Sequence, residues 1–340
     1  MANPINYQDA LLQMQEYGLD VDALDLSKND FVRCRVVGEG KEKRGWYRIF
    51  LQVRGSDSAE YIVGKFGCWR GCDNDAQTIA LRGLGAALTT EERSRNKKII
   101  SEAMQAKKAA DAERIRLVAE QAHQAWNTYK ADGESDYLKK KGVQGYGVRY
   151  GADGELIVPV RDTRGKIYGL QIIRGAAAKG TGKLEKEFFP QGMAAKGHFH
   201  MIGAPSASNL IIIAEGYATA ASLFEAVGYP VAVAFYADNL FPVGEALRKR
   251  YPKANLLFCA DDDAAQKCRH CKKHVWLYDG DTCPHCGEPH GALNKGVASA
   301  KQAALALCRG ERGAGSADFM VPCFPPDVDA KRRETWMAEQ

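Results

Sequence analysis

The chain has 340 residues, of which 45% are hydrophobic and 26% are charged, and its formal net charge is +5. These values are ordinary for a folded protein of two or three domains, and no apolar run reaches the ~20 residues that a membrane span needs. The N-terminus lacks the basic-then-apolar layout of a secretory signal. We therefore expect a cytoplasmic protein with no membrane partner, whose charge permits nucleic acid as a partner without requiring it.

Residues 1–88 are predicted to form a small N-terminal β-rich module. The β-prone runs Trp46–Val53 and Tyr61–Gly64 are separated by Gly-Ser-Asp-Ser, which is typical of a turn. Three of the ten cysteines lie here, and no fourth metal ligand stands near them. We interpret them as buried free thiols. They are Cys34, Cys68 and Cys72.

Residues 89–142 are predicted to form a helical arm. Thr89 followed three residues later by Glu92 fits a capping box, in which each side chain bonds the other residue's backbone amide. The sequence then runs to Gly133 without Gly or Pro, rich in Ala, Lys, Glu and Arg. Its apolar stripe is thin, so we expect one long helix or two, packed on one side only.

Residues 143–207 are predicted to form a β-rich subdomain. Leu156–Asp162 and Arg164–Ile173 have the pattern of a β-hairpin. We expect Phe188–Pro190 and His198–Gly203 to extend this hairpin.

Residues 208–324 alternate between strand and helix. Continuous apolar strands separated by helices indicate an α/β domain whose parallel sheet is covered on both faces. An insertion at 264–292 interrupts the pattern, and 325–340 is expected to be a C-terminal tail. The expected strands are Leu210–Ala214, Val231–Phe235, Leu256–Ala260 and Asp318–Phe324. The expected helices are Tyr217–Val227, one capped by Asp238 or Asn239 and ending at Arg250, and one capped by Asn294 and ending at Cys308.

Acidic residues follow two of these strands directly. Glu215 ends the first strand, and Asp261-Asp262-Asp263 ends the third. Functional groups collect at the carboxyl ends of parallel strands. Because alternate side chains of an extended chain point the same way, Asp261 and Asp263 share a face and Asp262 opposes them. Acids at strand ends are often solvent-facing loop residues. Both sets in one α/β unit instead favour a site for Mg²⁺, which prefers carboxylate oxygens.

The insertion carries two Cys-x₂-Cys pairs separated by eleven residues. Four thiolates at this spacing close a tetrahedral Zn²⁺ site and leave no open position, so the zinc is expected to be structural. It would stabilise a ribbon too short to hold itself by core burial. The ribbon lies between Asp263 and Asn294, where it can touch a template or a partner. The predicted ligands are Cys268, Cys271, Cys283 and Cys286, with the nearby histidines as spares.

The motifs around the acids resemble the Toprim domain shared by bacterial-type primases, topoisomerases and some nucleases. They are Ala214–Thr219, Ala234–Leu240, Asp261–Asp263 and Asn294–Gly296. The likeness is strongest to primases of conjugative plasmids and phages, which are related to the bacterial replicative primase. It extends upstream through Tyr137–Val143, Leu156–Ile173 and 188–203, and covers about residues 120–324.

The resemblance implies a Rossmann-like Toprim catalytic domain with the Cys₄ zinc ribbon inserted in it. It implies a nucleotidyltransferase that makes short RNA primers on single-stranded DNA from NTPs, in replication of a phage or mobile element. A replicative helicase would be a further partner. Glu215 would act in acid–base chemistry or assist metal binding, and Asp261 and Asp263 would bind Mg²⁺ or Mn²⁺. Basic residues would hold template and incoming nucleotide: Arg161, Arg174, Lys179, Lys183 and Lys186.

Two other functions stay open at the level of sequence. One is a Toprim nuclease or topoisomerase. A topoisomerase needs a nucleophilic tyrosine in a separate large domain, and an ATPase-linked nuclease needs a Gly-x₄-Gly-Lys-Ser/Thr motif, which does not occur. The other is a non-catalytic zinc-ribbon DNA-binding protein, against which the intact acidic residues argue.

Overall fold

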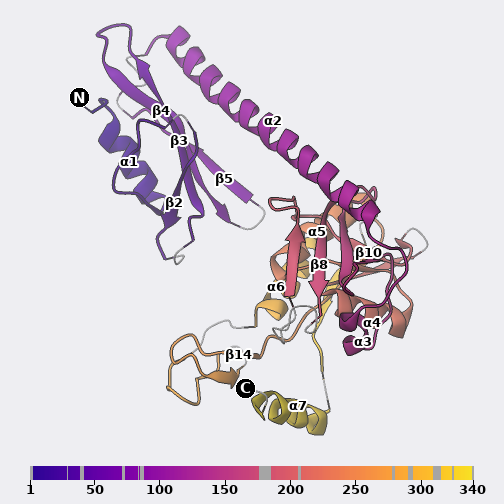
Figure 1. The fold of residues 1–340 in the computed structure, drawn as a ribbon. Helices are drawn as coiled ribbons and strands as arrows, with labels where there is room; N and C mark the ends of the chain where they lie inside the picture. Colours follow the sequence, from indigo (N-terminus) through magenta and orange to yellow (C-terminus); the bar gives the residue numbers. More distant parts are fainter. Residues whose placement is uncertain are drawn as a thin grey trace. The chain divides into compact units, whose positions relative to one another are not determined.

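The computed structural model describes residues 3–28, 30–38, 42–70, 73–82, 84, 88–175, 185–205, 208–277, 280–289, 294–308, 315–323 and 325–338. The chain divides into two compact units, Met1–Glu113 and Arg114–Gln340, traced in Figure 1. No helix among these residues combines the length and the apolar character that crossing a membrane would take.

The first unit holds a five-stranded antiparallel sheet with strands in chain order. β3 and β4 cover the two β-prone runs of the sequence. Alternate residues of β4 pack in different hydrophobic clusters. Ile62 packs with helix α1, whereas Tyr61 and Val63 pack with Ile100 of helix α2. The sheet is therefore covered on both faces. Its elements are α1 (Tyr7–Glu16), β1 (Leu19–Asp20), β2 (Val32–Val36), β3 (Gly45–Val53), β4 (Glu60–Arg70) and β5 (Asp73–Thr78).

Two of the N-terminal cysteines lie on strands that both pair with Gly45. Cys34 on β2 and Cys68 on β4 are 8% and 0% exposed. A Cβ on Gly45 would lie 2.7 Å from the sulfur of Cys34, so only glycine fits between the strands. Burial raises the pKa of Cys34 to about 11, which keeps its thiol protonated. Both behave as small apolar side chains, as expected, and Cys72 falls outside the described residues.

Helix α2 (Thr90–Thr128) is one continuous helix of 39 residues. The predicted capping box is present: the Thr89 amide donates to the Glu92 carboxylate at 2.8 Å, and the Glu92 amide donates to the Thr89 hydroxyl at 3.2 Å. The Gly55 amide also donates to Glu92, which ties the start of the helix to the turn after β3. In the second unit, Trp126 near the end of α2 packs with Leu170.

The second unit begins with α3 (Asp136–Lys141) and a four-stranded antiparallel sheet. Its order is β6-β7-β8-β9, and the predicted hairpin forms its centre. Pro190, which follows β9, ends this sheet. The strands are β6 (Arg149–Tyr150), β7 (Leu156–Arg161), β8 (Ile167–Arg174) and β9 (Glu185–Phe189).

A five-stranded sheet of order β10-β12-β11-β13-β16 forms the rest of the core. β12, β11, β13 and β16 are parallel, and β10 is an antiparallel edge strand. Alternate β11 residues face different layers: Ile212 packs with α4, and Ile213 packs with α5 and α6. The elements are β10 (His200–Ile202), β11 (Leu210–Ala214), α4 (Tyr217–Val227), β12 (Val231–Val233), η3 (Ala237–Asn239), α5 (Leu240–Arg250), β13 (Asn255–Cys259), α6 (Lys295–Cys308) and β16 (Ala317–Met320).

Two predictions about this sheet were wrong in their local detail. The segment around His200 pairs mainly with β12, with His200 opposite Val233, and it touches the hairpin only through an isolated bridge between Phe199 and Arg161. Residues 234 and 235 lie outside β12, and Phe235 takes a φ of +73°, which strand geometry excludes.

Asn239 occupies the N-cap position of α5, one of the two positions predicted, but its side chain makes no capping hydrogen bond. The side chain is fully buried and instead bonds backbone groups of residues 195–198 and of Ala234. The amide nitrogen donates to the carbonyls of Ala195, His198 and Ala234, and the amide oxygen accepts from Gly197.

The C-terminal segment, expected to be a tail, contains helix α7 (Pro326–Ala338). It contacts the insertion: the guanidinium of Arg332 lies 5.5 Å from the ring centre of Trp276. Proline at the first helical position and two aspartates in the first turn are helix-start signals.

Candidate catalytic site and metal centre

The acidic residues gather where two neighbouring parallel strands end. Ala214, the last residue of β11, pairs with Cys259, the last residue of β13. Glu215 follows the first strand at once, and Asp261 follows the second after one residue. The strand register therefore brings these two acids to the same edge of the sheet.

The ionisation of these acids is coupled. Burial raises the pKa of Glu215 to about 7, and the nearby carboxylates of Asp261 and Asp263 add to the shift. Burial also raises the pKa of Asp261, again with a contribution from Asp263. Burial is the larger cause of both shifts, and the neighbouring carboxylates add to it by opposing the ionisation of Glu215 and Asp261. A divalent cation would relieve this repulsion.

The three acids do not form a closed cage. Among the described residues, the four cysteines of the insertion are the one group of three or more His, Cys, Asp or Glu side chains gathered tightly enough to hold an ion unaided. An open carboxylate cluster still fits Mg²⁺, which usually keeps several waters and shares substrate phosphates with one or two carboxylates.

Helix α6 holds the aspartate run in place. The Gly296 amide donates to the Asp263 carboxylate at 2.8 Å. The side-chain oxygen of Asn294 accepts from the amides of Asp263 and Val297, both at 3.2 Å, so Asn294 caps α6 as predicted. Its side-chain nitrogen donates to Asp262 at 2.8 Å. Asp262 is thus bound by Asn294, whereas Asp263 is bound by the helix N-terminus.

Further polar side chains around the acids come from four elements, α3, β9, α4 and α6. The Thr219 hydroxyl, in the first turn of α4, donates to Asp261 at 3.4 Å. Lys186 on β9 lowers the pKa of both Glu215 and Asp261. Lys295 also lowers the pKa of Glu215, and Lys141 also lowers the pKa of Asp261. These lysines lie close enough to compensate part of the negative charge.

Lys141, Lys295 and Thr219 were not predicted as site residues, although each lies within or beside a quoted motif. Lys295 could have been predicted, because it is the first residue of a helix that begins beside the acidic run. Lys295 also forms a 2.9 Å ion pair with Asp238.

Two of the other predicted basic residues have partners of their own, and two lie outside the described residues. Arg174 pairs with Glu187 at 2.5 Å. Arg161 lies 5.5 Å from the ring centre of Trp126 and donates to the carbonyl of Gly165 at 3.2 Å. Lys179 and Lys183 lie outside the described residues. Of the five, only Lys186 is linked to the carboxylates here, and a role of the others in binding nucleotide or template stays a prediction.

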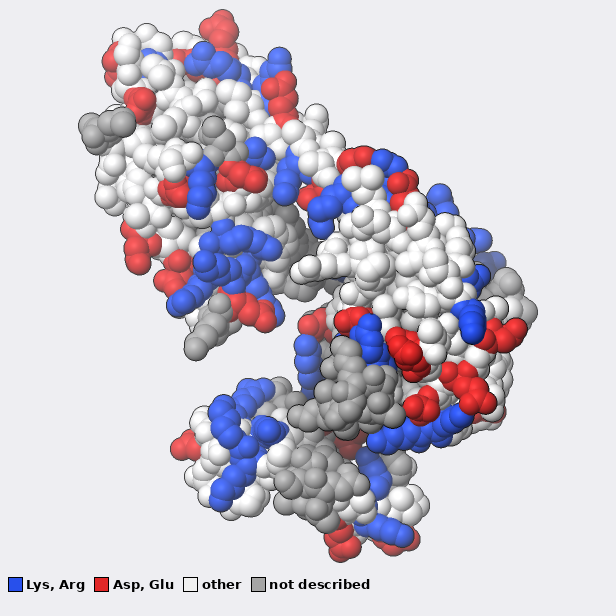
Figure 2. Space-filling view, viewed as in Figure 1, with Lys and Arg blue, Asp and Glu red and all other residues white. Residues whose placement is uncertain are grey.

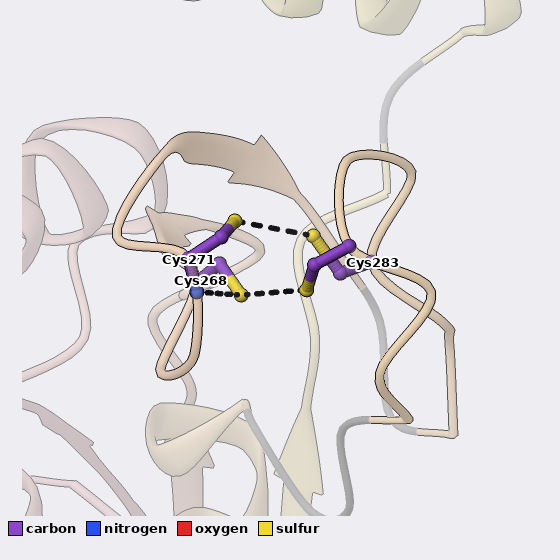
Figure 3. Close-up of side chains that lie close together, drawn as sticks. Cys268, Cys271 and Cys283 are labelled. Carbon is purple, nitrogen blue, oxygen red and sulfur yellow. Dashed lines mark hydrogen bonds between the residues drawn. The ribbon is translucent and has the colours of Figure 1, made fainter.

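The four cysteines of the insertion converge, as Figure 3 shows, with their sulfur atoms all within 4.8 Å of one another. Cys268 and Cys286 are 3.7 Å apart, and Cys271 and Cys283 are 3.8 Å apart. A tetrahedron with Zn–S bonds of about 2.3 Å has sulfur–sulfur edges of about 3.8 Å. The cluster therefore has the dimensions of a closed Zn²⁺ site.

The backbone around the cysteines has the form of two knuckles. The amides of His270 and Cys271 point at the sulfur of Cys268, both at 3.4 Å, and the His285 amide points at Cys283 at 3.4 Å. Amide donors of this kind stabilise thiolates. The strands β14 (Ala265–Lys267) and β15 (His274–Trp276) complete a small ribbon.

The ribbon carries a basic surface. Figure 2 shows blue side chains gathered over it. The exposed cations in its first half are Lys267, Arg269, Lys272 and Lys273.

Comparison with known proteins gives matches to DNA primases. Two proteins of Escherichia coli named "DNA primase TraC" are 30% identical over 195 residues and 31% identical over 203 residues. The matches cover 54% and 58% of this chain, and the chain spans only 13% and 16% of the length of these relatives. No protein-family model matches.

Solved structures of primases are also similar, at lower identity. A DNA primase domain from Pseudomonas aeruginosa is 16% identical with a TM-score of 0.36, covering 66% of this chain and 78% of that one. The Aquifex aeolicus primase, comprising zinc-binding and RNA polymerase domains, is 14% identical with a TM-score of 0.36, covering 97% and 83%. The sequence matches confirm the resemblance that the motifs indicated: over more than half of its length, this chain is similar to proteins named DNA primase TraC.

Proposed function

We propose that this chain is a DNA primase of the conjugative-plasmid or phage type, with a Toprim catalytic domain. It would make short RNA primers on single-stranded DNA from NTPs, in replication of a phage or mobile element. One observation carries the proposal. Glu215 and Asp261 follow two neighbouring parallel strands, with Asp263 beside them, in a chain related to DNA primases.

The carboxylates would hold Mg²⁺ or Mn²⁺. The raised pKa values of Glu215 and Asp261 support this: burial is their main cause and the neighbouring carboxylates add to it, and a bound cation would stabilise the ionised forms. A bound divalent cation would supply activation of the primer 3′-hydroxyl and stabilisation of the departing pyrophosphate. The pKa of about 7 describes Glu215 without a cation; a bound divalent cation would favour the ionised carboxylate.

The lysines around the carboxylates would bind the triphosphate of the incoming nucleotide. Three lysines from three different elements each lower the pKa of at least one of the acids: Lys186, Lys295 and Lys141. A triphosphate brought to a cluster of carboxylates would be repelled unless cations from the protein or from solution stood between them. Lysines in these positions supply part of that charge.

The zinc ribbon would be a structural element that contacts nucleic acid. Its four thiolates would hold Zn²⁺, and its exposed lysines and arginine would bind backbone phosphates of the single-stranded template. A replicative helicase is the further partner that the family resemblance implies.

Primer synthesis on single-stranded DNA tests the proposal. The protein is incubated with a circular single-stranded template, labelled NTPs and Mg²⁺ or Mn²⁺. We expect short oligoribonucleotides that are lost in Asp261→Ala, whereas Asp153→Ala, which removes an exposed loop aspartate, keeps them.

The alternatives give different products. Cleaved DNA without a requirement for NTPs would replace the primase with a nuclease. DNA binding with neither synthesis nor cleavage would leave a non-catalytic zinc-ribbon protein.

A further inference from the structure

The first unit contains an apolar groove that the proposed nucleotidyl transfer does not use. It lies between the C-terminal strands of the antiparallel sheet and the first half of α2, and has a volume of about 660 Å³. This is within the range of ligand-binding clefts. Its apolar lining is entirely aliphatic or thioether: Val63, Ile79, Leu81, Ile100 and Met104.

The charged side chains that line the groove are all basic. They are Lys65, Arg93, Lys97 and Lys108, and no Asp or Glu is among the described residues that line it. Within the described part of the chain, Lys65, Lys97 and Lys108 form no ion pair. Two lysines that flank this face of α2, one on each side, do: Lys98 pairs with Glu102 at 3.8 Å, and Lys107 with Asp111 at 3.6 Å. The groove is therefore lined by three lysines that have no acidic partner among the described residues.

We propose that this groove binds an acidic, amphipathic peptide segment of a partner protein. Aliphatic or aromatic side chains of the segment would fill the apolar floor, and its carboxylates would pair with the lysines at the edge. Methionine and aliphatic surfaces adapt to apolar side chains of different shape. Laying an amphipathic segment into such a groove is a common mode of peptide recognition.

The chemistry of the lining favours a peptide over single-stranded nucleic acid. Proteins hold unpaired bases mainly by stacking them on aromatic rings. None of the described residues that line the groove is aromatic. A nucleic acid would find cations for its phosphates but no platform for its bases.

The positions of the lysines limit the length of the segment. Lys97 and Lys108 are eleven residues apart on one helix, which places their α-carbons about 16 Å apart along its axis. An extended peptide covers that distance with about five residues, and a helical one with about three turns. The occupant would carry acidic residues at both ends of such a span, with apolar residues between them.

Selection from a peptide library tests the proposal while the partner protein is still unidentified. Random 16-residue peptides displayed on phage are selected on the immobilised full chain, and a fluorescent copy of an enriched peptide is titrated by anisotropy. We expect enriched peptides to combine Asp or Glu with Leu, Ile, Met or Phe. Lys97→Glu with Lys108→Glu should weaken binding at least about tenfold, as reversal of close charge pairs does.

The matched control is Lys98→Glu with Lys107→Glu, which makes the same change in net charge on the same helix, at two lysines that already have acidic partners. It should change affinity by less than about threefold. Ser101→Trp, which places a ring in the groove without a change of charge, should also abolish binding.

Several results would overturn the proposal. One is equal loss of affinity in the two charge-reversed pairs, and another is enrichment of peptides without acidic residues. A third is that no peptide binds, whereas a sixteen-nucleotide oligothymidine binds the wild type and does not bind the Lys97→Glu, Lys108→Glu variant. A fourth is concentration-dependent self-association that the same pair of substitutions removes, which would make a second copy of the chain the occupant. None of these readouts depends on primer synthesis.

Discussion

The backbone amide of Gly296 donates a 2.8 Å hydrogen bond to the carboxylate of Asp263. This contact joins the N-terminus of α6 to the acidic run after β13, and the whole zinc ribbon lies in the chain between the two residues. The positive end of the helix dipole stabilises the carboxylate there. The ribbon is therefore an insertion whose two ends are held together by the candidate catalytic site itself.

Gly296→Ala should disrupt this contact. A Cβ at this position would lie 2.3 Å from the carbonyl oxygen of Asp261 and 3.2 Å from the Asp263 carboxylate. The aspartate run and α6 would have to move apart, and we expect a loss of about 1–3 kcal/mol in the free energy of unfolding together with a loss of primer synthesis. Urea unfolding measures the first effect. Ala298→Ser, at an exposed position of the same helix, is the control, and equal behaviour of the two variants would contradict this role of Gly296.

Glu215→Gln should stabilise the fold at alkaline pH when no divalent cation is added. The folded-state pKa of Glu215 is about 7, above its ordinary value of 4.5, so the folded state binds this proton more tightly than the unfolded state. Stability is therefore lost as pH rises through the interval between these values and stays low above it. The variant removes that loss.

Because Glu215 is only partly buried and solvent screens its charge, we expect a gain of about 1 kcal/mol at pH 8 relative to pH 5.5. Urea unfolding of wild type and variant at the two pH values measures it. A variant that follows the pH dependence of the wild type would show that the pKa of Glu215 is not raised as described.

Asn239→Asp should destabilise the second unit although it preserves the shape of the side chain. The amide nitrogen of Asn239 donates to three carbonyls, and a buried carboxylate cannot donate to them. We expect a loss of about 2–4 kcal/mol at pH 7, measured by urea unfolding. Asn127→Asp on the exposed face of α2 is the control. A change below about 0.5 kcal/mol at Asn239 would contradict the hydrogen-bond assignment.

Cys283→Ser should reduce bound zinc to near zero. Three thiolates remain, and the ribbon is too small to stay folded without the metal. Zinc content by mass spectrometry of metals, with hydrogen exchange of residues 264–277, should show an unfolded ribbon beside a protected parallel sheet. Cys308→Ser, which removes an exposed cysteine on α6, should retain the metal. Full zinc occupancy in Cys283→Ser would refute the ligand set.

Local patterns in the sequence predicted their structures well. The capping box at Thr89 and Glu92, the helix that ends at Gly228, the cap at Asn294 and the two Cys-x₂-Cys pairs each depend on residues a few positions apart. Continuous apolar strands likewise predicted the core of the sheet, because a strand buried on both faces has no polar side to alternate with.

Features set by distant contacts were not predictable in the same way. The sheet that His200 joins depends on pairing with Val233, and the burial of Asn239 depends on carbonyls from another segment. Lys186 lies on β9 of the four-stranded sheet and Glu215 follows β11 of the five-stranded sheet, so their closeness depends on how the two sheets pack together. No periodicity within either segment reports such a contact.

Binding of Mn²⁺ followed by electron paramagnetic resonance tests the central claim most directly, since the free ion loses signal when the protein takes it up. The comparison uses zinc-loaded wild type, Asp261→Asn with Asp263→Asn, and the control Asp153→Asn. We predict that wild type and control take up Mn²⁺ equally and that the double variant binds at least about tenfold more weakly, because two carboxylate ligands are lost. Equal uptake by the double variant and the wild type would contradict the assignment of these aspartates as the seat of the catalytic cations.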